Sequence, residues 1–476
     1  MIRPAPMVVL LGMAALAATP VFAADTAEQQ LKQLQQQIDQ MRQDYEARLK
    51  ALEARVRQAE AGSSAAAVAP PSGTSSAATA AAPAPTPAAQ PLTAPVSTAA
   101  APTVANAFNP AISLILSASY ASLSQDPGSY RFNGFLTGAE IGPGVKGFSL
   151  GESELTISAT VDPWFFGSLS VALAADNGAS VEEAFLQTTA LPAGLGLKAG
   201  RFLSSIGYLN DKHAHTWDFI DQPLVYQAFL EGQLRQDGLQ LRALLPTDQY
   251  IELGGSIGAA GPFPSGGSNG NQPGTATVFA HTGGDVGISH SWRAGLSYLW
   301  AKSNDRESWD VDASGNSVTQ LFSGNTRMLV VDGVWKWAPN GNAQRTSLTL
   351  QGEYMHRDES GSLTYDGTGQ ALTDSFSAVQ SGWYAQAVYK FLPEWRVGLR
   401  YDRLNVGNVD AASNNGNLFV PAYSPTRSTL MFDWTPSEYS RVRFQYAYDS
   451  ARYGLTDNQF TVQYQLSLGA HGAHGF

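Results

Sequence analysis

The chain has 476 residues, a net charge of −11 at pH 7 and no cysteine. The lack of cysteine excludes disulfide scaffolds, thiolate metal sites and a lipid-modified N-terminal cysteine. Charged residues are sparse at 14%, whereas aromatic residues reach 10% and glycines number 46, a composition unusual for a soluble protein.

A secretory signal peptide is predicted over residues 1–23. Arg3 is the only charge before an apolar core, Met7–Ala18, and Val21–Ala23 supplies the cleavage positions. With about twelve apolar residues, this core is too short for a membrane-spanning helix, and no later stretch reaches the roughly twenty that such a helix needs. We therefore expect an exported protein without a helical anchor.

Residues 26–60 are predicted to form an α-helical coiled coil. Apolar residues recur at steps of three and four, with one stutter between Tyr45 and Leu49. The flanking positions are nearly all Gln, Arg, Glu and Lys, so we favour self-association over a single amphipathic helix lying on another surface. The seam does not fix the number of helices. Its apolar positions are Leu31, Leu34, Ile38, Met41, Tyr45, Leu49, Leu52, Val56 and Ala59.

Residues 61–107 are predicted to be a linker. They consist almost wholly of Ala, Pro, Ser and Thr and contain no charged residue. Such a segment cannot bury enough apolar surface to fold, so we expect a semi-extended spacer.

From residue 108 onward the apolar pattern has a period of two. In Arg441–Asp449, the residues Val442, Phe444, Tyr446 and Tyr448 alternate with mostly polar and charged ones. A soluble sandwich would pack branched aliphatic residues on its apolar face, whereas this face is rich in Trp and Tyr. Transmembrane β-strands fit the pattern better. It recurs in Leu155–Val161, Trp292–Trp300, Trp383–Phe391 and Phe460–Leu468.

Short turn signals alternate with long polar loops throughout residues 108–476. Large aromatic residues such as Trp164, Trp395 and Trp434 lie beside the short turns, as in an interfacial girdle. This alternation predicts an all-β fold, namely a transmembrane antiparallel β-barrel of about sixteen strands with short periplasmic turns and long external loops. Both chain ends would then lie in the periplasm, where the coiled coil is expected.

A barrel of about eighteen strands stays open as an alternative. The segment Leu224–Leu230 alternates well enough to be read as an additional strand. Asp221 before Pro223, and Gly232 after the segment, instead favour a short helix.

Several local sequences resemble a known family. They are Gly151–Leu155, Val181–Phe185, Leu197–Phe202 and the terminal aromatic Phe476. With the predicted architecture, residues 26–476 resemble the trimeric sixteen-stranded porins of Gram-negative outer membranes, specifically the phosphate-selective porin O/P type. The resemblance implies a homotrimer whose third external loop, Ser204–Gln236, folds into the barrel and narrows it. The family's anion selectivity does not carry over, because the only Lys or Arg residues of this loop are Lys212 and Arg235.

The third loop and the lumen wall supply the candidate site residues. Acids on the loop opposite bases on the wall would orient dipolar solutes and penalise apolar ones. Alternatively, the wall arginines pair with lumen neighbours such as Asp402 and Asp449 and only stiffen the barrel. The residues predicted at the pore constriction are Asp211, Lys212, Trp217, Asp218, Asp221 and Glu231. The arginines predicted on the lumen wall are Arg293, Arg396, Arg400, Arg441 and Arg443.

Two histidine pairs suggest metal binding as an alternative role. His213 and His215 in the third loop, and His471 and His474 near the chain end, have spacings suited to zinc or copper. The other interpretation is that they are ordinary polar residues.

Together these observations predict a porin for the passive diffusion of small hydrophilic solutes, located in the outer membrane with its coiled coil in the periplasm. We expect no enzyme activity, since the sequence does not indicate a nucleophile and a base in one site. We also expect no cofactor and no nucleic-acid partner; the expected partners are outer-membrane lipid, further copies of the chain and the cell wall. A zinc-type uptake channel using the histidine pairs, and a structural tether of the outer membrane to the cell wall, are the alternatives. The acidic balance of the barrel favours cations or neutral solutes, unless most acids lie on external loops.

Overall fold

The computed structural model describes residues 110–151, 153–173, 178–267 and 270–469. The predicted signal peptide, coiled coil and linker fall outside these ranges, as do His471, His474 and Phe476. Among the residues it describes, no helix is long and apolar enough to cross a membrane.

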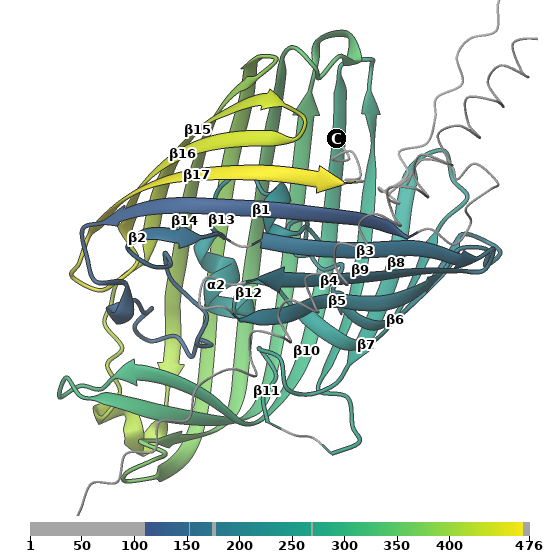
Figure 1. Cartoon of the computed structure of the whole chain (residues 1–476). Coiled ribbons are helices and arrows are strands. Elements are labelled where there is room, and N and C mark those ends of the chain that lie inside the picture. Colours follow the sequence, from purple (N-terminus) through teal and green to yellow (C-terminus); the bar gives the residue numbers. More distant parts are fainter. Residues whose placement is uncertain (1–109, 152, 174–177, 268–269, 470–476) are drawn as a thin grey trace, which may run out of the picture. The chain divides into compact units, whose positions relative to one another are not determined.

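The described residues form one large β-sheet, together with a short α-helix and several 3-10 turns (Figure 1). The strands are β1 (Ala111–Leu123), β2 (Gly147–Leu150), β3 (Ser153–Asp162), β4 (Phe165–Leu173), β5 (Ala179–Thr188), β6 (Leu195–Leu203), β7 (Arg235–Leu244), β8 (Tyr250–Gly258), β9 (Thr275–Val286), β10 (His290–Val311), β11 (Ser317–Trp337), β12 (Ser347–Tyr365), β13 (Leu372–Leu392), β14 (Trp395–Asp410), β15 (Thr426–Ser437), β16 (Ser440–Ser450) and β17 (Asp457–Gly469). The helical segments are η1 (Pro127–Ser129), η2 (Ala214–Thr216), α2 (Leu224–Leu230), η3 (Pro339–Gly341) and η4 (Ala412–Gly416).

The sheet closes on itself into an antiparallel barrel. From β3 to β17, each strand pairs antiparallel with its sequence neighbours. The first and last strands also pair, from Ser113 opposite Gly469 to Leu123 opposite Gln459. Closure leaves no free sheet edge, which is the condition for a β-structure to stand in lipid.

The strands β2 and β3 occupy one place in the wall. Both pair with β1, β2 opposite Ala118–Ala121 and β3 opposite Ala111–Ile115. The interruption lies at Gly151, where an added Cβ would stand 2.3 Å from the Ser117 Oγ. The 17 strands of the described sheet therefore fill sixteen places, which confirms the predicted barrel size.

The alternative of about eighteen strands is wrong, because Leu224–Leu230 forms the helix α2. All seven of its residues are buried, whereas a strand in this barrel would bury only one face. Pro223 stands immediately before the helix with φ −56°, a backbone angle that proline favours. The helix ends at Leu230; the next residue, Glu231, lies in the left-handed region at φ 50°, and Gly232 follows at φ 101°.

The barrel wall has a polar inner face and an apolar outer face over most of its strands. On β16, Arg443, Gln445 and Asp449 are buried, while Phe444 and Tyr446 are exposed on the outside. The predicted phases of β10, β13 and β17 hold in the same way. So extensive an apolar outer surface is favourable only in lipid. Other exposed outward residues include Leu116, Leu169, Leu239, Ile257, Leu296, Leu350, Leu399, Leu430 and Tyr464.

The wall is much taller on one side than on the other. β10, β11, β12 and β13 have 22, 21, 19 and 21 residues, whereas β4, β6 and β8 have 9 each. Because about 9–11 residues suffice for a tilted strand to cross the hydrocarbon, the tall strands, teal to green in Figure 1, are long enough to extend beyond it.

A hydrophobic cluster fills part of the lumen. α2 contributes Leu224, Tyr226 and Phe229, and the first loop, residues 124–146, contributes Phe132 and Phe135. The inner wall is apolar at this place because α2 needs an apolar surface on which to pack. The first loop therefore also folds inward, although its sequence indicated only a long polar loop. The wall residues of the cluster include Leu299, Met328, Val330, Met355, Tyr384 and Leu404.

Candidate functional site

The third loop, residues 204–234, is closed at its base by Asn210. The Asn210 side-chain amide donates to the carbonyl oxygens of Ser204 and Leu234 at 2.7 and 3.1 Å, and its Oδ1 accepts from the Leu234 backbone nitrogen at 2.7 Å. Asn210 is 0% exposed. A buried amide with three partners holds the two ends of the loop together. No sequence pattern had indicated this residue.

Glu353 on β12 holds the first turn of the loop against the wall. Its carboxylate accepts from the backbone nitrogens of Tyr208 and Leu209 at 3.1 and 3.0 Å, and from the hydroxyls of Tyr226 and Tyr384 at 2.9 and 2.7 Å. One wall residue thereby joins the start of the loop, α2 and β13. Sequence analysis missed Glu353, although strand phase would have placed it in the lumen.

Asp221 anchors the later part of the loop to β14, β15 and β16. Its carboxylate lies 3.0 Å from the Arg400 Nη2 and 2.6 Å from the Arg427 Nη1, and it accepts from the Gln445 Nε2 at 2.7 Å. Burial alone would raise the pKa of Asp221, but Arg400 and Arg427 lower it, and the net pKa is below that of an ordinary carboxyl. Sequence analysis missed Arg427, which is the second residue of β15.

Wall acids share the arginines that bind the loop. Arg396 lies 2.9 Å from Asp218 of the loop and 2.6 Å from Asp433 on β15. Arg400 likewise contacts Asp402 on its own strand at 2.9 Å. The sequence left two roles open for these arginines, facing the acids of the loop or pairing within the wall. In the structure the same arginines do both.

Two further arginines, on β16, bind the backbone of the loop. Arg441 donates to the carbonyl of His215 at 2.8 Å, and Arg443 donates to that of Trp217 at 2.9 Å. The Trp217 side chain is buried in the hydrophobic cluster, and its indole nitrogen donates to the Lys212 carbonyl at 2.8 Å. Trp217 therefore stabilises the fold of the loop and does not stand free in the lumen.

Arg293 lies apart from the other predicted arginines, near the start of the loop. It contacts Asp332 at 3.5 Å, and its guanidinium lies 5.2 Å from the centre of the Tyr208 ring. The Lys212 ammonium lies 5.6 Å from the same ring and 3.5 Å from Asp211. The structure therefore groups Arg293 with Asp211 and Lys212 rather than with the arginines of β14 and β16.

Glu231 lies at the end of α2 and binds the first loop. Its Oε1 accepts from the backbone nitrogens of Ala139 and Glu140 at 2.6 and 3.1 Å. Of the predicted constriction residues, Glu231 is thus the one that joins the two inward-folded loops.

His213 and His215 attach the loop to the side of the barrel formed by β3 and β5. The His213 Nδ1 lies 3.2 Å from Glu154 and 3.4 Å from Glu182, and its Nε2 lies 3.0 Å from Glu183. The His215 Nδ1 lies 2.9 Å from Glu154. Burial alone would lower the pKa of His213, but its hydrogen bonds to the three glutamates raise that pKa well above the ordinary value. The three glutamates were not predicted as site residues; the inward phase of Glu154 and the pair Glu182-Glu183 were the available signals.

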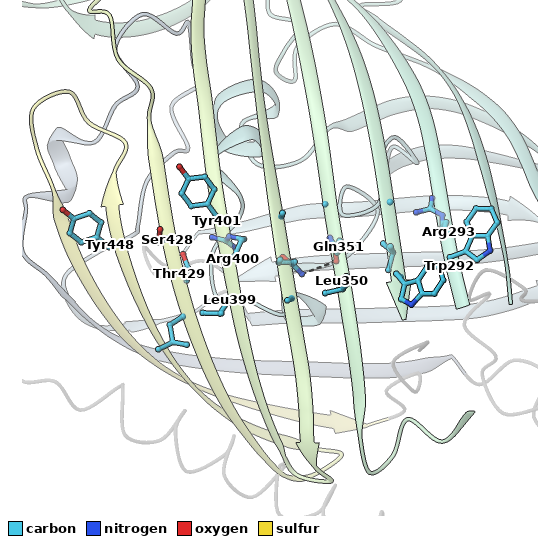
Figure 2. Close-up of a pocket in the computed structure, with 18 of the residues that line it drawn as sticks. Trp292, Arg293, Leu350, Gln351, Leu399, Arg400, Tyr401, Ser428, Thr429 and Tyr448 are labelled. Atoms are coloured by element: carbon cyan, nitrogen blue, oxygen red, sulfur yellow. Dashed lines mark hydrogen bonds between the residues drawn. The ribbon is translucent and has the colours of Figure 1, made fainter. Parts of the chain in front are cut away.

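A hollow of 1110 Å³ lies along the wall from β10 to β16, and none of its lining residues belongs to the third loop (Figure 2). Most of the lining residues face outward by strand phase, and the inward Gln351 accepts a hydrogen bond from Gln386 at 3.2 Å within the same wall. We interpret the hollow as a feature of the lipid-facing surface. Outward lining residues labelled in Figure 2 are Trp292, Leu350, Leu399, Tyr401 and Tyr448.

The closed wall, the apolar exterior and the inward third loop define a transmembrane β-barrel whose lumen is partly filled by its own loops. No family model matches the chain. A protein of Aquifex aeolicus (strain VF5), described as uncharacterised, is 30% identical over 402 residues, which cover 79% of this chain and 81% of that protein. The chain belongs to the family of this Aquifex protein.

Several solved structures of bacterial proteins are similar to this chain. The outer membrane channel DcaP of Acinetobacter baumannii is 13% identical with a TM-score of 0.46, covering 76% of this chain and 96% of that one. An anion-selective porin from Comamonas acidovorans is 10% identical with a TM-score of 0.47, covering 76% and 99%. OmpT of Vibrio cholerae in its trimer form is 12% identical with a TM-score of 0.47, also covering 76% and 99%. These similarities are too weak to transfer a function to this chain.

Proposed function

We propose that the protein is an outer-membrane porin that lets small hydrophilic solutes diffuse passively, and that the third loop forms the constriction of its pore. The observation that carries this proposal is the attachment of the loop to both sides of the lumen, at Glu183 on β5 and at Glu353 on β12. Barrels of about sixteen strands enclose more space than wall side chains fill, so such a loop sets the width of the passage.

The charges at the loop support a passage for polar solutes. Asp218 and Asp221 face Arg396 and Arg400, so carboxylates and guanidinium groups lie next to each other at the edge of the loop. A dipolar solute could exchange its water for these groups, whereas an apolar solute could not. The loop acids of this network are paired with arginines, and the overall acidic balance favours neutral solutes or cations over anions.

The proposal includes a homotrimer, which rests on the family resemblance. It also includes a periplasmic coiled coil, which rests on the sequence pattern. The tether alternative rests on residues 26–107, which lie outside the described part of the chain. No specific contact favours it over the porin.

Reconstitution of the full chain into planar bilayers and liposomes tests the proposal. We expect discrete conductance steps and swelling of liposomes in solutions of small sugars. In a salt gradient, the reversal potential should be near zero or have the sign that indicates cation selectivity. If the folded protein gives no conductance steps and no swelling, the barrel is only an anchor and the tether interpretation is favoured.

A further inference from the structure

The third loop brings one histidine to two wall glutamates in an arrangement suited to a metal ion. The His213 Nδ1 and one carboxylate oxygen each of Glu154 and Glu182 lie within 4.8 Å of one another. The Glu154 side chain is 6% exposed, and those of Glu182 and His213 are 12% and 20% exposed. The three residues come from β3, β5 and the loop, so the fold itself assembles the cluster.

The hydrogen bond on the other side of the ring sets the orientation of His213. Its Nε2 lies 3.0 Å from Glu183, which can only accept at that position, so the Nε2 carries a proton. Without a metal, a second proton on the Nδ1 makes the ring a cation that donates to Glu154 and Glu182. A metal ion at the same place would replace that proton and bind the Nδ1 lone pair together with the two carboxylate oxygens. A carboxylate that accepts from the second ring nitrogen is also the usual partner of a metal-binding histidine.

The separations of the ligand atoms fit a small divalent metal. A tetrahedral zinc ion with bonds of about 2.1 Å separates its ligand atoms by about 3.4 Å. The His213 Nδ1 lies 3.2 Å from Glu154 and 3.4 Å from Glu182. One imidazole and two carboxylates suit zinc and its first-row neighbours, whereas calcium prefers six to eight oxygen ligands.

We propose that His213, Glu154 and Glu182 bind one divalent first-row transition-metal ion of the zinc type, which joins the third loop to β3 and β5. Glu183 orients His213, and His215, 2.9 Å from Glu154, orients that carboxylate. Binding at this site does not require an open pore, so the inference can hold or fail independently of the porin proposal.

Zinc titration of the full chain in detergent tests the site by calorimetry. The background protein carries His471→Ala and His474→Ala, so that the histidines near the chain end do not bind the added metal, and it is treated with a chelator beforehand. We expect one zinc ion per chain. His213→Ala should abolish this binding, and Glu183→Gln should weaken it by about 10- to 100-fold, as loss of an orienting carboxylate does.

His290→Ala is the matched control, because His290 lies at a short turn and contacts Trp335 instead. It should leave zinc binding unchanged. Circular dichroism in detergent checks that each variant keeps the barrel; if His213→Ala does not fold, Glu182→Gln, at a half-buried position, decides in its place. The proposal is overturned if the background protein does not bind zinc, or if His213→Ala or Glu182→Gln binds it equally tightly. In that case a proton on His213, and not a metal ion, joins the loop to the two glutamates.

Discussion

The Asp221 carboxylate lies 2.6 Å from the guanidinium of Arg427, which is fully buried in the barrel wall. Arg400 contacts the same carboxylate at 3.0 Å. One loop acid thus compensates two wall cations, and the free energy of this contact depends on both sides being charged.

Asp221→Asn should release the later part of the third loop. The substitution keeps the shape of the side chain but leaves two buried guanidinium groups without this partner, which costs roughly 3 kcal/mol. We expect faster hydrogen exchange across residues 211–230, measured by mass spectrometry in detergent. Asp248→Asn, at an exposed turn, is the control. Unchanged exchange in the loop of Asp221→Asn would show that the pair does not hold it.

Acid should weaken the same contact. The pKa of Asp221 is lowered in the folded protein, below the value of about 3.9 for an unfolded aspartate. A carboxyl with a lowered folded pKa contributes its stability above the unfolded pKa and loses it as the pH falls through the folded pKa. The protection factor of the loop, which corrects for the pH dependence of the intrinsic exchange rate, should therefore be steady above about pH 4 and fall below it. The fall should be absent in Asp221→Asn; an equal fall in that variant would assign the transition to other groups.

Asn210→Ala should open the base of the loop. Three hydrogen bonds disappear, and at about 1 kcal/mol for each the loss is about 3 kcal/mol. The Leu234 carbonyl keeps the Ser204 N–H as a partner, whereas the Leu234 N–H loses its partner. Thermal unfolding and exchange at Ser204 and Leu234 measure the effect. Asn408→Ala, at an exposed position of β14, should have little effect on either. Equal effects of the two substitutions would show that Asn210 does not hold the two ends of the loop together.

Gly382→Leu should displace α2 from the wall. A Cβ at Gly382 would stand 2.5 Å from the Leu404 Cδ2 and 2.9 Å from the Val225 Cγ2 of α2. Overpacking of this kind costs about 1–3 kcal/mol, and relief by movement of α2 would narrow the remaining passage. We expect a lower melting temperature and a smaller single-channel conductance. Gly333→Ala, where an added Cβ meets nothing within 4 Å, should change neither.

Strand phase made most of the barrel predictable from sequence. A period of two is local information, and nine residues such as Arg441–Asp449 suffice to show which side chains face the lumen. The short helix was also indicated, through Pro223 and Gly232. These signals need no knowledge of distant residues.

The partners of the third loop were less predictable, because they come from remote strands. Tyr208 and Glu353 are 145 residues apart in sequence, and only barrel closure brings them together. The same holds for His213, whose glutamate partners lie 30 residues or more before it. The inward fold of the first loop was missed because Phe132 and Phe135 stand among glycines and polar residues without a regular period. The arginines of β14 and β16 were placed by phase, but their division between loop acids and wall acids required the structure.

Single-channel conductance with and without the third loop tests the central claim most directly. In the variant, residues 205–233 are replaced by a short Gly/Ser turn between β6 and β7, and circular dichroism confirms the barrel. We predict that the wild-type chain conducts and that the variant conducts several-fold more, because the loop that narrows the lumen is gone. Equal conductance of two folded proteins, or no conductance from either, would contradict the account.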